Sequence, residues 1–251
     1  MSGIISALFF FWKKCLNIIT MDQKTQKELL EIVKYNYEEI AGDFDETRKK
    51  AMWPEILKLT NDISINDSVL DVGCGNGRLL EVLKERGVKY LGVDASENLI
   101  GICRKRYLDY KFEISNILNL SQISEINFDY VFCVAVLHHL PGQNLQIDAL
   151  KQLKNKIKNE GRIILTVWNL WSHEKYRALI HKFIFLKIIG KNKMDIGDIV
   201  FDWKKADGYT VSKRYYHAFN KRELKTICKA SGLKIEKLYK DSDNYYLVLK
   251  K

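Results

Sequence analysis

Residues 69–77 read Val69-Leu-Asp-Val-Gly-Cys-Gly-Asn-Gly77, and seventeen residues after Gly77 the run Tyr-Leu-Gly-Val ends on Asp94. The apolar, β-branched residues before the loop are typical of a buried parallel strand. The three glycines let the backbone turn sharply and approach a ligand where a Cβ atom would intrude. A carboxylate at the end of the next strand suits hydrogen bonding to both hydroxyls of a ribose. The stretch therefore predicts a binding site for a nucleotide-type cofactor.

The residues around this loop separate two classes of cofactor. The dinucleotide fingerprint requires glycine at the sixth loop position, where this chain has Arg78. Two residues before the first glycine stands Asp71, whose carboxylate would repel a pyrophosphate but could bind, directly or through water, the ammonium group of an amino acid. Together these features resemble the loop Asp-x-Gly-x-Gly-x-Gly of class I methyltransferases. The resemblance implies S-adenosylmethionine (SAM) as the cofactor.

Further cofactor contacts are expected at the ends of the following strands. The resemblance implies an acid after the third strand, in a Gly-Asp pair, where this chain has Ser115-Asn116. An asparagine oxygen can still accept a hydrogen bond from the adenine amino group, so cofactor binding is expected to survive with less charge. The predicted cofactor-binding residues are Asp71, Gly73, Cys74, Gly75, Gly77, Asp94, Ala95, Asn116, Ile117 and Val134.

Length and composition are those of one ordinary α/β domain. A chain of 251 residues can bury one full core, and 47% apolar with 29% charged residues is usual for a globular protein. The five cysteines are scattered, with no Cys-x-x-Cys pair, which argues against a disulfide framework and against a structural zinc site. No metal site is therefore predicted, and a reducing cytoplasm fits best.

The first twenty residues are a separate question. Residues 4–12 form a nine-residue apolar run that ends at Lys13-Lys14, whereas a helix that spans a bilayer needs about 20 residues. A secretory signal would carry its charges before the run and a small-residue cleavage site after it, and neither is present. Two hypotheses remain open: translation begins at Met21, or residues 1–20 are a short interfacial anchor. Residues 21–251 are predicted to form a single methyltransferase domain, with a substrate-recognition insert at about 170–220.

Strands and helices are predicted to alternate through this domain. The expected strands are 68–72, 90–93, 110–114, 130–134 and 162–168; the expected helices are 27–40, 54–59, 78–86, 97–107 and 145–159, with a polar turn at 44–50 and a hairpin-like pair at 233–240 and 245–250. The predicted fold class is α/β: a doubly wound, mostly parallel, Rossmann-like sheet with a C-terminal antiparallel strand pair and a basic helical insert. In such sheets the ligand lies beyond the carboxyl ends of the strands, where the glycine loop and Asp94 both fall.

Several segments outside the loop are more particular. They are 36–44 with Thr47-Arg48, Trp53-Pro54, 135–140, Val167-Trp168, 198–204, and Arg214-Tyr-Tyr-His217 with Phe219. With the glycine loop, these pieces resemble the family of tRNA wobble-uridine carboxyl methyltransferases of yeast and animals, from about Tyr35 to the C-terminus. The resemblance implies that the methyl acceptor is a carboxylate on a modified uridine. Such a group is ionised at pH 7 and needs orientation by cations rather than a general base.

The resemblance also suggests which residues meet the substrate. Arg48, Lys204 and Arg214 are predicted to orient the acceptor, since a guanidinium can hold a carboxylate or phosphate with two hydrogen bonds. Tyr215, Tyr216, His217 and His138 are predicted to line the pocket. His138 could instead act as a base towards a hydroxyl or amine, or cap the backbone at the end of its strand. The predicted catalytic set is Arg48, His138, Lys204, Arg214, Tyr216 and His217.

Basic charge is concentrated in residues 151–193, where eleven Lys and Arg residues stand against two Glu residues, a balance of +9 out of the chain's +10. Such a segment attracts phosphates, and Trp168, Trp171 and Tyr176 offer faces on which an unpaired base could stack. tRNA is therefore the expected partner. The alternative is that the lysines of 145–159 form only a solvated helix face. Residues 181–189 are expected to pack onto the edge of the core, so that membrane contact is not expected.

Three functions from different classes remain open. The first is a SAM-dependent methyltransferase that acts on tRNA. The second is a SAM-dependent O- or C-methyltransferase of a small acidic, lipid or quinone-like metabolite, for which the basic segment would be incidental. The third is a non-catalytic partner protein with the SAM fold, which the intact loop and Asp94 disfavour. Whether a small activating protein partner is required stays open.

Overall fold

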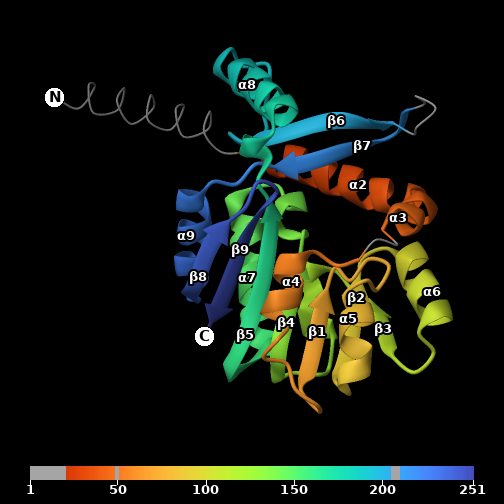
Figure 1. Cartoon of the computed structure of the whole chain (residues 1–251). Helices are drawn as coiled ribbons and strands as arrows, with labels where there is room; N and C mark the ends of the chain where they lie inside the picture. The colour runs from red at the N-terminus through yellow and green to blue at the C-terminus, as the bar shows by residue number, and fades with distance from the viewer. Residues whose placement is uncertain (1–20, 49–50, 205–209) are drawn as a thin grey trace.

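The computed structural model describes residues 21–48, 51–204 and 210–251, without the side chains of Lys204, Thr210 and Val211. Its central sheet has seven strands in the order β3-β2-β1-β4-β5-β9-β8 (Figure 1). The strands are β1 (Ser68–Val72), β2 (Lys89–Asp94), β3 (Lys111–Ile114), β4 (Phe128–Val134), β5 (Ile157–Trp168), β8 (Lys234–Lys240) and β9 (Asn244–Lys250). The first five are parallel, and β9 runs antiparallel to both β5 and β8. The predicted doubly wound sheet with its antiparallel pair is confirmed.

Alternate residues of the buried strands supply a hydrophobic core on each face of the sheet. On β1, Leu70 and Val72 pack into one core and Val69 into the other, because successive side chains of a strand point to opposite faces. The first core is covered by η2 (Ile117–Gln122), α7 (Gln143–Lys156) and α9 (Lys221–Ala230); the second by α4 (Pro54–Leu59), α5 (Leu80–Leu83) with η1 (Lys84–Arg86), and α6 (Glu97–Arg106). The near-continuous apolar character of the strands follows from this burial on both sides.

Three of the described α-helices begin at side chains that cap them. Asp22 accepts a hydrogen bond from the N–H of Thr25 at the start of α2 (Gln23–Glu39), and Ser96 accepts one from Leu99 at the start of α6. Asn220 and Glu223 form a reciprocal capping box at the start of α9. Each cap satisfies backbone donors that have no partner within their helix, and so fixes where the helix begins.

A separate layer lies over the carboxyl ends of the parallel strands (Figure 1). It consists of α2, α3 (Ala41–Thr47), α8 (Glu174–Ile188) and the antiparallel hairpin of β6 (Asp198–Lys204) and β7 (Thr210–His217), with η3 (Leu137–His139) and η4 (Leu170–Ser172) beneath it. Tyr216 packs with Ile180 and Ile199, while its neighbour Tyr215 packs with Leu29 and Met194. The hairpin is therefore held from both sides. Among the described helices, none combines the length and apolarity needed to cross a bilayer.

Some sequence-based expectations are wrong in detail. The predicted turn at 44–50 is helical up to Thr47, because Phe44 packs edge-on against Tyr37, with 5.8 Å between the ring centroids. The helix expected at 78–86 begins only at Leu80, since the residues after the glycines form turns. Residues 157–161, expected to end a helix and turn, extend β5 instead. The hairpin and α9 were not predicted.

Candidate functional site

The glycine loop has the backbone that its sequence requires. Gly73, Gly75 and Gly77 have φ angles of +73°, +57° and +78°, in the left-handed region that favours glycine. A Cβ atom on Gly73 would lie 2.2 Å from Cγ2 of Val136, so no larger residue fits there without a shift of its neighbour. The N–H groups of Gly73 and Cys74 donate to the carbonyl of Val93 at 2.7 and 3.0 Å, which fixes the loop to the end of β2.

A cavity of about 540 Å³ opens directly over this loop, a volume within the range of small-molecule sites. Nine of the ten residues predicted to bind the cofactor line it: Asp71, Gly73, Cys74, Gly75, Asp94, Ala95, Asn116, Ile117 and Val134. The tenth, Gly77, does not line the cavity. It allows close packing instead, because a Cβ atom there would lie 2.6 Å from Cε2 of Tyr107.

Two carboxylates of the cavity suit the two polar ends of SAM. Asp94 accepts hydrogen bonds from the N–H groups of Gly75 and Ser96, both at 2.9 Å, and keeps lone pairs for ribose hydroxyls. Asp71 accepts a hydrogen bond from the Tyr90 hydroxyl at 2.8 Å. Burial raises the pKa of Asp71 to about 7 and also raises the pKa of Asp94. A buried carboxyl of this kind gains most from a cationic ligand, such as the ammonium of a methionine moiety.

At the end of the cavity beside β3, Asn116 stands in place of the acid that the resemblance implies, and the lining remains polar. The Asn116 side-chain oxygen accepts a hydrogen bond from the N–H of Leu118 at 2.9 Å and so begins η2, while a second lone pair stays available. The neighbouring Ser115 hydroxyl is buried without a hydrogen-bond partner among the described residues. Because buried polar atoms are normally paired, this hydroxyl marks a place for a ligand atom or water. The residues present therefore fit SAM.

A second cavity, of about 450 Å³, adjoins the first. The two share Arg48, Trp53, Arg78 and Trp168. The second is further lined by Pro54, Glu55, Leu170, His173, Tyr176, Asp241, Asp243, Asn244 and Tyr246. A molecule in the second cavity would thus meet one in the first across two arginines and two tryptophans.

The two arginines at this junction repel one another. The pKa of Arg78 is lowered by burial and then by the nearby Arg48 guanidinium. Arg78 stacks over the ring of Trp53 and Arg48 over that of Phe44, each at 5.3 Å from the centroid. Within the described residues neither guanidinium has a carboxylate at ion-pair distance. Asp71 lies close enough to Arg78 to raise its pKa, and Glu55, Asp241 and Asp243 line the second cavity. Two like charges at one junction, neither of them in an ion pair among the described residues, can nevertheless receive an anion. Arg78 was not among the predicted substrate residues, because its sequence position served only to exclude a dinucleotide.

A cluster of rings forms the wall behind Trp168. The Trp168 ring lies 4.9 Å from that of Tyr216 and 5.2 Å from that of His138, centroid to centroid. His138 is fully buried, its Nδ1 accepts a hydrogen bond from the N–H of Trp168 at 3.4 Å, and burial holds its pKa well below the usual range. It lines neither cavity, so the reading as a strand-end residue that caps the backbone matches its position. His139, which was not predicted, lines the cofactor cavity and contacts the Tyr37 hydroxyl at 2.8 Å.

The remaining predicted residues lie on the hairpin, and Arg214, Tyr216 and His217 are not among the residues that line the two cavities. Arg214 is half-buried, stacks over Trp203 at 5.1 Å from the ring centroid, and has an Nε atom without a partner among the described residues. Burial raises the pKa of Tyr216 to about 12, although Arg214 and then Arg48 lower it, so both guanidiniums lie near this ring. Lys204 ends β6, and its side chain lies outside the described residues.

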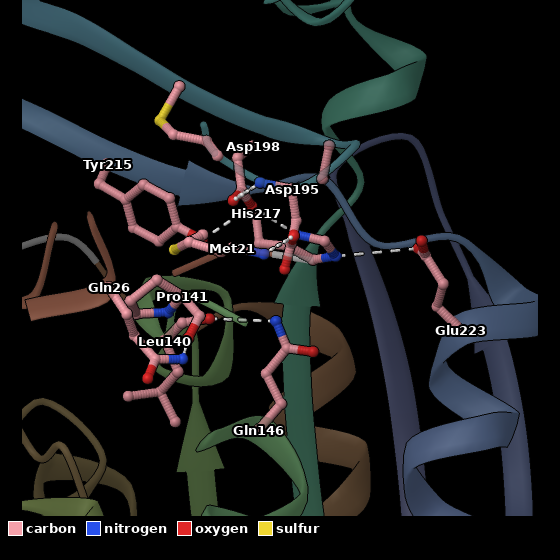
Figure 2. A network of polar contacts seen from close by, with 12 residues as sticks. Met21, Gln26, Leu140, Pro141, Gln146, Asp195, Asp198, Tyr215, His217 and Glu223 are labelled. Carbon is pink, nitrogen blue, oxygen red and sulfur yellow. Dashed lines mark hydrogen bonds and ion pairs between the residues drawn. The ribbon is translucent and has the colours of Figure 1, made fainter. Parts of the chain in front are cut away.

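His217 does not line the pocket as predicted. Its Nδ1 bonds to Oδ1 of Asp198 at 2.7 Å, and its Nε2 lies 3.9 Å from Oε2 of Glu223 (Figure 2). The Tyr215 hydroxyl donates to the same Asp198 oxygen at 2.8 Å. These contacts make His217 part of a buried polar network that fastens the hairpin to α9.

The basic segment 151–193 is divided by the fold. The Lys156 ammonium is bound to the carbonyls of Ile123 and Glu125, and Lys158 forms an ion pair with Asp129 at 2.6 Å. α7 lies against the sheet, whereas α8 belongs to the layer above it (Figure 1). The segment is therefore not one patch, and the part of it that lines the second cavity runs from Trp168 at the end of β5 to Tyr176 in α8.

Comparison with known proteins identifies the family. A family model described as a methyltransferase domain matches residues 44–238. The chain belongs to this methyltransferase family. The methyltransferase is SAM-dependent, as its loop predicted, and its fold is that of the class I enzymes. Solved structures share this fold: a SAM-dependent methyltransferase of Methanosarcina mazei (TM-score 0.65, 16% identity, 80% of this chain and 99% of that one) and the CcbJ methyltransferase of Streptomyces caelestis (TM-score 0.65, 17% identity, 87% and 98%).

Curated relatives are more specific. A Schizosaccharomyces pombe protein named tRNA (carboxymethyluridine(34)-5-O)-methyltransferase is 26% identical, over 88% of this chain and 96% of that protein. The Saccharomyces cerevisiae protein of that name is 30% identical, over 60% of this chain and 52% of its own length. Animal relatives are longer than this chain: a Xenopus tropicalis protein of that name is 26% identical over 86% of this chain, and the match covers 40% of that protein.

Proposed function

We propose that this methyltransferase transfers the methyl group of SAM to a carboxylate on a modified wobble uridine of tRNA. The observation that carries the proposal is the pair Arg48 and Arg78, which lie where the cofactor cavity meets the second cavity and form no ion pair within the described residues. The names of the yeast relatives support the same acceptor. A cytoplasmic location is part of the proposal.

The second cavity suits a nucleoside that carries an acidic substituent. Trp53 and Trp168 offer ring faces for an unpaired base, and Arg48 and Arg78 offer donors for the carboxylate. Because the arginines line both cavities, a carboxylate held between them points towards the cofactor. Arg214, with its unpaired Nε and its stack on Trp203, is the residue we assign to a phosphate or neighbouring base of the same RNA.

The chemistry needs alignment more than proton transfer. SAM supplies a methyl group that is already activated. The acceptor carboxylate is ionised at pH 7, so the chain has to bind it, orient it in line with the methyl group and exclude water. His138, neutral and fully buried, is not placed to take a proton from the acceptor. The arginine pair supplies both charge and orientation.

The test is transfer of labelled methyl from SAM to tRNA, read by mass spectrometry of the digested nucleosides. Arg48→Gln and Arg78→Gln should each lower kcat/KM for tRNA by about 100-fold while SAM affinity changes by less than about threefold. Arg222→Gln, an exposed arginine on α9, is the matched control and should match the wild type. Label in a small acidic metabolite, with none in any nucleoside, would replace this proposal by the metabolite methyltransferase. No transfer at all together with no SAM binding would favour the non-catalytic alternative.

A further inference from the structure

Three polar residues join α3 to the glycine loop and to α6, which lies below α3 in the view of Figure 1. The Asp45 carboxylate of α3 accepts a hydrogen bond from the side-chain amide of Asn76 at 3.0 Å and forms an ion pair with Arg106, the last residue of α6, at 2.6 Å. The Arg106 guanidinium also donates to the carbonyl of Asn76 at 3.3 Å. Asp45 is 9% exposed and Asn76 4%. These residues are here called the α3 clamp (Asp45, Asn76, Arg106).

At one end the α3 clamp holds the cofactor loop. Asn76 stands between Gly75 and Gly77 and lines the cofactor cavity. Phe44, which precedes Asp45, lies over the same loop, because a Cβ atom on Gly75 would lie 3.1 Å from Cε1 of the Phe44 ring. The loop thus meets α3 through a polar contact and an apolar one. A ligand that fills the cofactor cavity therefore contacts residues that the clamp holds in place.

At its other end the α3 clamp holds the acceptor site. The Arg48 N–H donates to the carbonyls of Phe44 at 3.1 Å and of Asp45 at 3.2 Å, so Arg48 ends the helix that Asp45 anchors. The Arg48 guanidinium stacks over the Phe44 ring and lines both cavities. The position of this guanidinium at the junction of the two cavities is therefore set by the position of α3.

α3 needs contacts of this kind to keep its place. It has seven residues, and its N-cap residue Ile40 provides no side-chain cap. Isolated helices shorter than about 12 residues are marginal in water, so that most of their stability comes from tertiary contacts. The ion pair between Asp45 and Arg106 is partly buried and is therefore screened less by water and salt than an exposed pair. We therefore expect α3 to shift when the clamp is broken.

We propose that Asp45 is a positioning residue for Arg48, and that the cofactor and the anionic acceptor bind cooperatively through the α3 clamp. The inference rests on the proposed function, which makes Arg48 a ligand of the acceptor carboxylate. A cofactor that fixes the glycine loop also restricts Asn76 and, through Asp45, α3. The acceptor then meets an arginine that is already in place, so its binding costs less conformational entropy. By thermodynamic linkage the acceptor tightens cofactor binding by the same factor.

The first test is a double-mutant cycle on methyl transfer to tRNA at saturating SAM. Asp45→Ala should lower kcat/KM for tRNA by about 30-fold, since misplacement of a binding group by about 1 Å can cost about 100-fold. Because Asp45 acts through Arg48, Asp45→Ala/Arg48→Gln should lose less than about threefold beyond Arg48→Gln alone. Two residues that act independently would instead give about the product of their separate losses. That result would overturn the positioning role.

The second test measures the coupling without turnover. Calorimetry gives the affinity for S-adenosylhomocysteine, which lacks the transferable methyl group, with and without saturating substrate tRNA. We expect tRNA to tighten this binding by about tenfold in the wild type and by less than about twofold in Asp45→Ala. Asp45→Asn, which keeps one oxygen acceptor but not the charge, should show intermediate coupling. Absence of coupling in the wild type, or wild-type coupling in Asp45→Ala, contradicts the proposal.

Asp129→Ala is the matched control. Asp129 also forms an ion pair at 2.6 Å, with Lys158, and accepts hydrogen bonds from the N–H and hydroxyl groups of Ser68 at 2.9 and 2.7 Å. It lies near the start of β4, at the end of the sheet opposite the glycine loop. Its removal should lower the melting temperature and leave both kcat/KM for tRNA and the coupling unchanged. If Asp45→Ala likewise loses only stability, the clamp is structural and the proposal fails.

Two further outcomes are distinguished by the same measurements. If Asp45→Ala does not bind S-adenosylhomocysteine, Asp45→Asn replaces it in both tests, with smaller losses expected in the same direction. Wild-type transfer to tRNA in Arg48→Gln would contradict the acceptor role of Arg48, which is a failure of the proposed function. A large loss in Arg48→Gln together with independent losses in the double variant would reject only the role of Asp45.

Discussion

The Asp94 carboxylate accepts a hydrogen bond from the backbone N–H of Gly75 at 2.9 Å. One side chain thus ties the end of β2 to the middle of the glycine loop. Its other oxygen accepts the N–H of Ser96 at 2.9 Å, where α6 begins. The acid predicted to hold the ribose therefore also fixes the shape of the loop around the cofactor.

Asp94→Ala should lower SAM affinity by about 10- to 100-fold, since hydrogen bonds to a charged group are worth about 1.5–3 kcal/mol. Isothermal calorimetry measures the change. Glu38→Ala is the matched control, because Glu38 also accepts backbone N–H groups at the start of α6, from Glu97 at 2.8 Å and Asn98 at 3.3 Å, yet does not line the cavity. Equal losses in the two variants would show that Asp94 acts only through the fold.

Gly73→Ala should reduce SAM affinity by about tenfold or more, since the residue has a φ of +73° and the added Cβ would lie 2.2 Å from Cγ2 of Val136. Gly73→Ala/Val136→Ala should recover part of the affinity by removing the clash but not the backbone strain. Gly101→Ala, inside α6 with open space around it, should leave affinity unchanged and raise the free energy of unfolding by about 0.5–1 kcal/mol. Wild-type SAM affinity in Gly73→Ala would show that the close contact between residue 73 and Val136 does not shape the cofactor site.

The cofactor half of the site was predictable because its information is local. The residues from Val69 to Asp94 carry their strand, turn and acid within one βαβ unit, and five of the nine predicted residues that line the cavity come from it. The other four directly follow β2, follow β3 or end β4, as expected at the carboxyl ends of parallel strands. The substrate half depends on residues far apart in the chain. Arg78 follows the glycine loop, and only the fold brings it to Arg48, at the end of α3, and to Trp168, at the end of β5.

The wrong prediction that His217 lines the pocket has a simpler cause. Arg214-Tyr-Tyr-His217 was taken as one pocket-lining motif, whereas in a strand successive side chains alternate between faces. Tyr215 and His217 therefore share a face and both bind Asp198, while Tyr216 faces Trp168. Recognition of β7 in the sequence would have separated the two sets.

SAM affinity should rise with pH through neutrality, because burial raises the pKa of Asp71 to about 7 and the bound ammonium favours its ionised form. With that pKa, the fraction ionised predicts a gain of about eightfold between pH 6 and pH 7.5. Calorimetry in two buffers of different ionisation enthalpy should also detect proton release on binding. Asp71→Asn should bind more weakly, with little dependence on pH over this range. An equal slope in wild type and Asp71→Asn would assign the effect to another group.

The stability of the hairpin layer should fall as pH rises above about 6.5, because of His217. Burial by itself lowers the pKa of this imidazole, but the hydrogen bond and charge of Asp198, with Glu223 and Asp195 nearby, raise it overall. A raised histidine pKa gives stability that is fully present below the unfolded value of about 6.5 and is lost as pH rises through the folded value.

His217→Gln should therefore flatten the decline of the melting temperature between pH 6 and pH 8.5, and lower it most at pH 6. A hydrogen bond to a charged group is worth about 1.5–3 kcal/mol. In a chain of this size each kcal/mol shifts the melting temperature by roughly 2–4 °C. Asp71 and Asp195 also have raised pKa values, with burial as the chief cause. Their contribution to stability therefore also falls as pH rises, and it remains in the His217→Gln variant. The quantity to compare is therefore the slope of melting temperature against pH in the wild type and in His217→Gln. His181→Gln is the control, because His181 is an exposed histidine of α8. If His217→Gln keeps the wild-type slope, the charge on His217 does not hold the hairpin to α9.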